Sequence, residues 1–103
     1  MRKERKQVAV HDFTLRLRQE LPHLQQEYAV QSLGLFGSYV RGEQRKGSDL
    51  DVLIEFSQTP GIFRFLELER MLSSLLGVTV DLVHKDAVKP AIGRRILHEI
   101  QPI

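Results

Sequence analysis

Two apolar runs separated by a short polar segment constrain this chain most strongly, in the stretch LFGSYVRGEQRKGSDLDVLIEF from residue 35 to 56. The first run ends in Gly37-Ser38, ten residues follow, and Asp49 and Asp51 open the second run. Glycine lets backbone approach a ligand closely, and a serine that starts a short helix offers donors to an anion. Aspartates one residue apart on a strand point the same way, and paired carboxylates suit Mg²⁺. The stretch therefore predicts a site for a phosphate group and a metal ion.

The size of the chain predicts one small domain that spans residues 1–103. Its 42% hydrophobic and 27% charged residues are typical of a globular fold. The absence of cysteine excludes disulfides and cysteine-based zinc sites. No apolar run approaches the roughly 18 residues of a membrane span, and the start MRKERK leads into an amphipathic segment, unlike a signal peptide. We therefore expect no membrane contact and a cytoplasmic location.

The net charge of +2 is mild, and much of the excess lies at the start of the chain, at Arg2, Lys3, Arg5 and Lys6. Short basic termini are usually solvated ends. No aromatic residues are interleaved with these charges to stack on bases. Direct binding of nucleic acid is therefore not expected.

Apolar periodicity predicts four helical and three strand segments. A helix from about residue 8 should break near Leu21, because Pro22 follows, and continue to about residue 28. Ser38 should cap a short helix that runs to about residue 45. The remaining segments are strands at 30–36, 49–56 and 78–83, and helices at 62–76, ended by Gly77, and 90–100. This order predicts an α+β fold, an α/β sandwich with a small mixed sheet of three or four strands and helices packed on one face.

Asp81 stands out in the third strand, because an isolated carboxylate in so apolar a segment costs desolvation energy unless a cation or a donor meets it. The metal hypothesis predicts that it lies beside Asp49 and Asp51; the alternative is an exposed aspartate on an edge strand. Arg41, one helical turn after Ser38, is placed to contact a phosphate or to face solvent. Arg45 and Lys46 could neutralise a triphosphate, but solvent exposure is the favoured interpretation for loop residues of this kind. His84 and Lys85 could border the site or form a turn at the end of the strand.

The combination of Gly37-Ser38, Asp49-Leu50-Asp51 and Asp81 resembles the nucleotidyltransferase superfamily related to DNA polymerase β. With its short chain it is similar to the minimal nucleotidyltransferases (MNT) of HEPN/MNT toxin–antitoxin pairs. The resemblance implies transfer of AMP from ATP, with two Mg²⁺ ions held by the three aspartates and phosphate contacts from Gly37 and Ser38. The implied acceptor is a tyrosine hydroxyl of a cognate HEPN ribonuclease toxin, with which the chain could form a hetero-oligomer as antitoxin.

Two other functions stay open at this point. The chain could be a non-catalytic ATP-binding subunit that masks a toxin by contact, or a free-standing transferase for a small acceptor. Larger nucleotidyltransferases carry extra domains to hold the acceptor, so the length of 103 residues favours a partner protein that presents its own. Nucleotide preference, the number of nucleotides transferred and the oligomeric state do not follow from the sequence.

Overall fold

A computed structural model of the chain describes residues 2–103, with side chains from residue 9 onward, so the basic side chains at positions 2–6 lie outside the described part. The elements, in chain order, are α1 (Arg2–Tyr28), β1 (Val30–Phe36), α2 (Ser38–Arg41), β2 (Leu50–Phe56), α3 (Ile62–Leu76), β3 (Val80–His84), the 3₁₀ helix η1 (Lys85–Ala87), α4 (Pro90–Glu99) and β4 (Gln101–Pro102). The bounds predicted for β1 and α3 are confirmed. Helix α2 ends earlier than predicted, and β4 was not placed by the sequence.

The four strands form one mixed sheet in the order β3-β2-β1-β4. Strand β1 pairs antiparallel with both β2 and β4. Strands β2 and β3 are parallel, because α3 crosses over between them. The predicted fold class, a small mixed sheet with helices packed on it, is confirmed.

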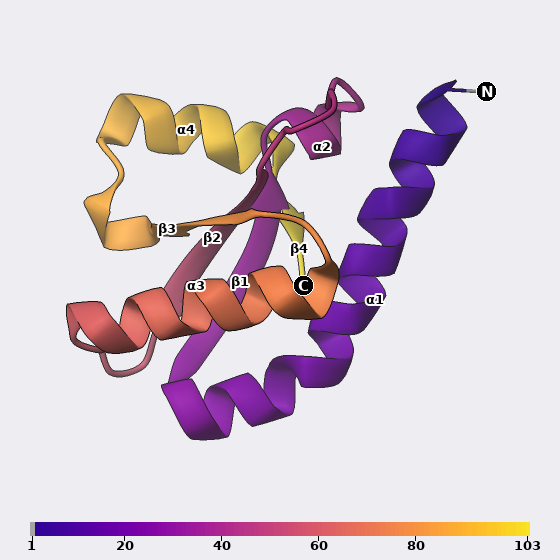
Figure 1. Cartoon of the computed structure of the whole chain (residues 1–103). Helices are drawn as coiled ribbons and strands as arrows, with labels where there is room; N and C mark the ends of the chain where they lie inside the picture. Colours follow the sequence, from indigo (N-terminus) through magenta and orange to yellow (C-terminus); the bar gives the residue numbers. More distant parts are fainter. Residues whose placement is uncertain (1) are drawn as a thin grey trace.

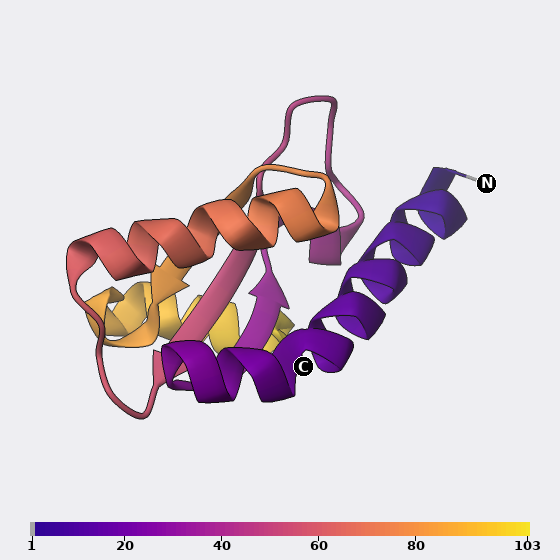
Figure 2. The same ribbon diagram turned by 60° about the horizontal axis from the view of Figure 1, so that its bottom comes forward.

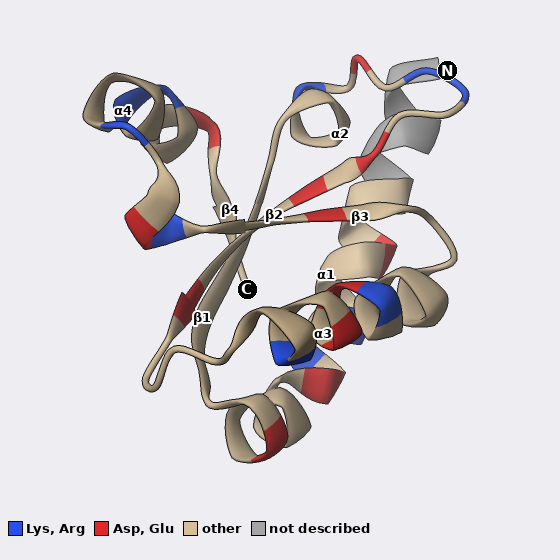
Figure 3. Cartoon of the chain, turned by 60° about the vertical axis from the view of Figure 1, so that its left-hand side comes forward, with Lys and Arg blue, Asp and Glu red and all other residues tan. Residues whose placement is uncertain are grey.

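The helices lie on both faces of the sheet, which corrects the expectation that all of them cover one face (Figures 1 and 3). Helices α1 and α3 cover the face formed by Leu50, Val52 and Ile54. Both helices contribute fully buried leucines to this core: Leu17 and Leu24 from α1, and Leu68 and Leu72 from α3. Each such side chain contributes about 1.5–3 kcal/mol to folding.

Helix α4 covers the opposite face, where the buried residues Leu53 of β2 and Ile96 of α4 line one small cavity. The predicted apolar stripe of α4 is only partly used, because Ile92 and Leu97 are more than half exposed. The second layer is needed because the alternation of β2 leaves Leu53 on the face away from α1 and α3.

Helix α1 runs without interruption through Pro22, so the predicted break near Leu21 is wrong. Proline has no N–H to donate to the carbonyl four residues earlier and crowds it, which bends a helix that tertiary packing holds on both sides. Figures 1 and 2 show α1 changing direction in its C-terminal half. The bend keeps Leu17 and Leu24, which lie on opposite sides of the proline, in the same core.

Side chains of α3 cover the backbone of β3, which is an edge strand. The backbone N–H of Val80 donates to Ser73 Oγ at 2.9 Å, and that of Leu82 donates to Glu69 Oε2 at 2.8 Å. These bonds blunt an edge that could otherwise pair with another chain. In the part of the chain that the structure describes, no helix is long and apolar enough to cross a membrane.

Candidate active site

Segments far apart in the sequence meet at the end of the sheet next to α2 (Figure 3). Antiparallel pairing sets Phe36, the last residue of β1, opposite Asp51 of β2. Parallel pairing sets Asp51 beside Asp81 of β3. Asp81 therefore lies beside Asp51, as predicted. Asp49 lies two residues before Asp51 in the sequence, just before β2 begins.

Gly37 connects β1 to α2 with a backbone that favours glycine, at φ 83° and ψ −157°. A Cβ atom at this position would overlap the Asp51 carboxylate, with Asp51 Cγ only 3.0 Å away. The sequence predicts that this glycine admits a ligand. The structure adds that the same glycine makes room for a carboxylate of the site.

Ser38 is the first residue of α2, and Gly37 takes the N-cap position that the sequence assigned to Ser38. The reason is the turn at Gly37, whose dihedral angles already set the direction of the helix. Helix α2 ends at Arg41, because Gly42 adopts the left-handed conformation and its N–H donates to Tyr39 O at 3.2 Å. Ser38 thus stays next to Gly37 at the end of the sheet.

Asp51 is half-buried, and its pKa is raised to about 6, mainly by burial and then by the negative charges of Asp81 and Asp49. Arg41 offsets this in part, since its positive charge lowers the same pKa. Carboxylates that repel one another in a partly desolvated site hold a cation well. The electrostatics of the site therefore fit a bound divalent ion.

Asp49 and Asp81 are both exposed, and Asp81 lies on an edge strand, so the edge-strand reading of Asp81 also describes its position. Among the side chains that the structure describes, no three acidic or histidine groups converge closely enough to form a metal site. Asp51 therefore has two neighbouring carboxylates, Asp49 and Asp81, and both are exposed and can turn toward an ion.

Arg41 is held by two glutamates, the nearby Glu43 and Glu99 of α4, and no local sequence pattern predicts the second contact. Its Nη1 donates to both carboxylate oxygens of Glu99, at 3.0 and 2.9 Å, and its Nε donates to Glu43 Oε2 at 3.1 Å. The bond to Glu99 is the main reason that the pKa of Arg41 lies above its usual value. Glu99 also accepts the backbone N–H of Gly37 at 3.2 Å.

The remaining basic residues near the motifs lie in the loop before β2 or at the far end of β3. Arg45 and Lys46 are exposed in the loop before β2, as predicted. His84 lies at the far end of β3, where its ring stacks on Phe56 with centroids 5.4 Å apart and its Nδ1 accepts the Asp86 N–H. Lys85 donates to Glu55 at 3.3 Å. The last two residues therefore form the predicted strand-end turn.

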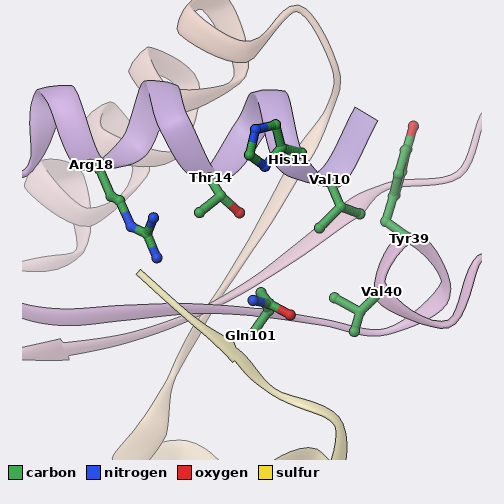
Figure 4. Close-up of a pocket in the computed structure, with 7 residues that line it drawn as sticks. All are labelled: Val10, His11, Thr14, Arg18, Tyr39, Val40 and Gln101. Atoms are coloured by element: carbon green, nitrogen blue, oxygen red, sulfur yellow. The ribbon is translucent and has the colours of Figure 1, made fainter. Parts of the chain in front are cut away.

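A cavity of about 350 Å³ lies between α1, α2 and β4, close to the site but without any of its three aspartates (Figure 4). Its lining residues are Val10, His11, Thr14, Arg18, Tyr39, Val40 and Gln101. Tyr39 packs edge-on against Phe13 with ring centroids 5.6 Å apart. This contact anchors α2 to α1. The cavity therefore borders the packing between these two helices and not the three aspartates.

The three aspartates and the glycine-serine turn are the features expected of a nucleotidyltransferase, and comparison with known sequences assigns the chain to that class. The sequence model of the nucleotidyltransferase domain family matches residues 16–103, and the chain belongs to that family. It is 44% identical, over 77 residues, to the protein adenylyltransferase MntA of Thermococcus cleftensis, and the match covers 75% of this chain and 78% of the relative.

Solved structures agree with this assignment. One assigned as a minimal nucleotidyltransferase is 35% identical, with a TM-score of 0.71 over 87% of this chain and 93% of the other. A toxin–antitoxin complex with AMP-PNP is 26% identical, with a TM-score of 0.67 over 82% and 69%. A complex of a tri-AMPylated Shewanella oneidensis HEPN toxin with an MNT antitoxin shares the fold at 23% identity, with a TM-score of 0.59 over 94% and 70%.

Proposed function

We propose that this chain transfers AMP from ATP to a tyrosine hydroxyl of a cognate HEPN-type toxin and so acts as its antitoxin. The observation that carries the proposal is Asp51, which lies in register with Asp81 and packs against Gly37 at one end of the sheet. Family membership supports nucleotidyl transfer, and the names of the relatives support a protein acceptor. Because ATP is the donor, we place the reaction in the cytoplasm.

Asp49, Asp51 and Asp81 are the residues proposed to hold Mg²⁺. The raised pKa of Asp51 supports this, because a cation would offset both the burial of the carboxylate and its repulsion by Asp81 and Asp49. When bound, Mg²⁺ neutralises charge on the attacking and leaving oxygens of an in-line displacement. Asp49 and Asp81 are exposed and can turn toward the ion without disturbing the core.

Each side of the site has a proposed role in the reaction. The N–H of Gly37, Ser38 and the guanidinium of Arg41 bind the triphosphate. Asp81 accepts the proton of the attacking hydroxyl. The tyrosine oxygen bonds to the α-phosphorus, the bond from that phosphorus to the bridging oxygen breaks, and pyrophosphate leaves.

The exposure of Asp81 on an edge strand favours a protein acceptor over a small molecule. A tyrosine presented by a folded partner can approach an open carboxylate, whereas a small acceptor is normally held in a concave pocket. The surface of the proposed toxin would then cover the exposed side of the site next to Asp81.

Incubation with α-labelled ATP, Mg²⁺ and the product of the adjacent gene tests the proposal. Label should appear on a tyrosine of the partner, and Asp49→Asn with Asp51→Asn should abolish it. Asp86→Asn is the matched control, since Asp86 is exposed and lies beyond the far end of β3. Inhibition of the partner without label would instead show masking by contact, and label on a small molecule would show a free-standing transferase.

A further inference from the structure

The carboxylate of Glu99 occupies the two groups that the proposed function assigns to the nucleotide. Its Oε1 accepts the Gly37 N–H at 3.2 Å, and both of its oxygens accept Arg41 Nη1, at 3.0 and 2.9 Å. Carboxylate and phosphate oxygens are recognised by guanidinium and amide donors in the same way. In this structure a protein side chain thus fills an anion site next to the three aspartates.

The C-terminal segment holds Glu99 in this position from both sides. Glu99 ends α4, and the next residues pair as β4 with β1, Leu35 opposite Gln101 and Gly34 opposite Pro102. Ile100 lies directly on Gly34, where any Cβ atom would overlap the isoleucine side chain. The backbone around Glu99 is therefore fixed, whereas its side chain, which is 23% exposed, has room to turn outward.

The charges around Glu99 favour its replacement by a metal-bound nucleotide. Glu99 adds a negative charge close to Asp51, and the charges of Asp49 and Asp81 already act on Asp51. The compensating cation is Arg41, whose side chain is 43% exposed and also contacts Glu43. A partly exposed ion pair of this kind contributes little to stability, so breaking it costs little.

We propose that Glu99 competes with the triphosphate for the Gly37 N–H and Arg41, and that nucleotide binding displaces its side chain. This inference rests on the proposed function. The apparent affinity for nucleotide is then the intrinsic affinity multiplied by the fraction of molecules in which Glu99 has released these groups. For a partly exposed pair this corresponds to a roughly 3–10-fold reduction.

Direct binding of a fluorescent, non-hydrolysable ATP analogue in the presence of Mg²⁺ tests the competition. Glu99→Gln and Glu99→Ala should both bind the analogue about 3–10-fold more tightly than wild type. Glu43→Gln is the matched control, because it removes the same charge from beside Arg41 and leaves the Gly37 N–H bonded to Glu99. It should change the affinity by less than about twofold.

Equal or weaker binding by both Glu99 variants, with an unfolding midpoint like that of wild type, would overturn the inference. Weaker binding would make Glu99 a positioning residue that orients Arg41. A wild type that binds the analogue and labels its partner, together with unchanged Glu99 variants, would defeat the competition alone. Absence of binding by wild type and variants alike would defeat the proposed function as well.

Discussion

The α-carbon of Gly37 packs against the Asp51 carboxylate, so that the turn after β1 and the central aspartate of the site occupy adjoining space. The contact joins the two halves of the glycine-serine and aspartate motif, which the sequence separates by a polar loop. It also makes the residue at position 37 a direct neighbour of the reacting centre in the proposed reaction.

Gly37→Ala should impair both folding and transfer. The new methyl group would overlap the Asp51 carboxylate, and the φ of 83° is unfavourable for alanine. We expect a loss of about 2–4 kcal/mol in the free energy of unfolding and loss of AMP transfer. Gly42→Ala is the control, since Gly42 has φ 71° but open space around it, and should cost only about 1 kcal/mol. Urea unfolding measures the loss of stability in both variants. Equal losses in the free energy of unfolding would contradict the proposed overlap at Gly37.

Asp51→Asn should stabilise the metal-free protein at neutral pH while abolishing transfer. The folded protein raises the pKa of Asp51 from 3.8 to about 6, so the stability linked to its protonated form is fully present below pH 3.8 and is lost as pH rises through about 6. Since Asp51 is half-exposed, we expect a gain of about 1–2 kcal/mol in the variant above pH 7.

Urea unfolding in EDTA at pH 4 and pH 8 measures this difference. The two proteins should have similar stability at pH 4 and diverge at pH 8. Adding Mg²⁺ and nucleotide should stabilise wild type more than the variant, because a ligand stabilises only the state that binds it. A variant less stable than wild type at pH 8 in EDTA would show that Asp51 is not strained by its neighbours.

Gly34→Ala should loosen β4, because the new methyl group meets Cδ1 and Cγ1 of Ile100. A cost of about 1–3 kcal/mol in the free energy of unfolding is expected from this overpacking. Combining it with Ile100→Ala should restore part of the loss, since the shorter side chain removes the overlap. Denaturant titrations of the two single variants and the double variant form the test. Strict additivity would mean that the two residues do not touch.

Glu69→Ala should weaken the edge of the sheet by leaving the Leu82 N–H without its acceptor. We expect a cost of about 1–2 kcal/mol and increased self-association by light scattering. Glu67→Ala on the same helix is the control, because the exposed ion pair of Glu67 with Arg64 should contribute about 0.5 kcal/mol. If Glu69→Ala is as stable as Glu67→Ala and self-associates no more, Glu69 does not protect the edge of the sheet.

Elements with a strong local signal were predictable. The apolar run of β1 and the periodic stripe of α3, closed by Gly77, have the bounds expected from the sequence. The alternation in β3 set Asp81 on a defined face, and the βαβ connection brought it beside Asp51. The motif residues lie together because the pairing of β1, β2 and β3 sets the ends that carry them at the same edge of the sheet.

Features that depend on long-range contacts were not predictable. Strand β4 has two residues, too few for any periodicity, and exists because β1 offers a free edge. The side of the sheet that α4 covers depends on Leu53, whose burial is a property of the assembled fold. Glu99 has no local signal, because its partners lie 62 and 58 positions earlier in the chain. Pro22 does not end α1, because the packing of Leu17 and Leu24 on either side of it keeps the helix continuous.

The separation of Gly37 from Glu99 by 62 positions has a consequence for folding kinetics. Non-local contacts form late, because the entropy of closing a long loop is lost before the contact repays it. The contact of Glu99 with Gly37 and Arg41 forms only when α4 has docked and β4 has paired with β1. An intermediate that contains only β1, β2 and their covering helices would already have a core but no Glu99 contact, so formation of that contact during refolding should lag behind the burial of Leu17 and Leu24.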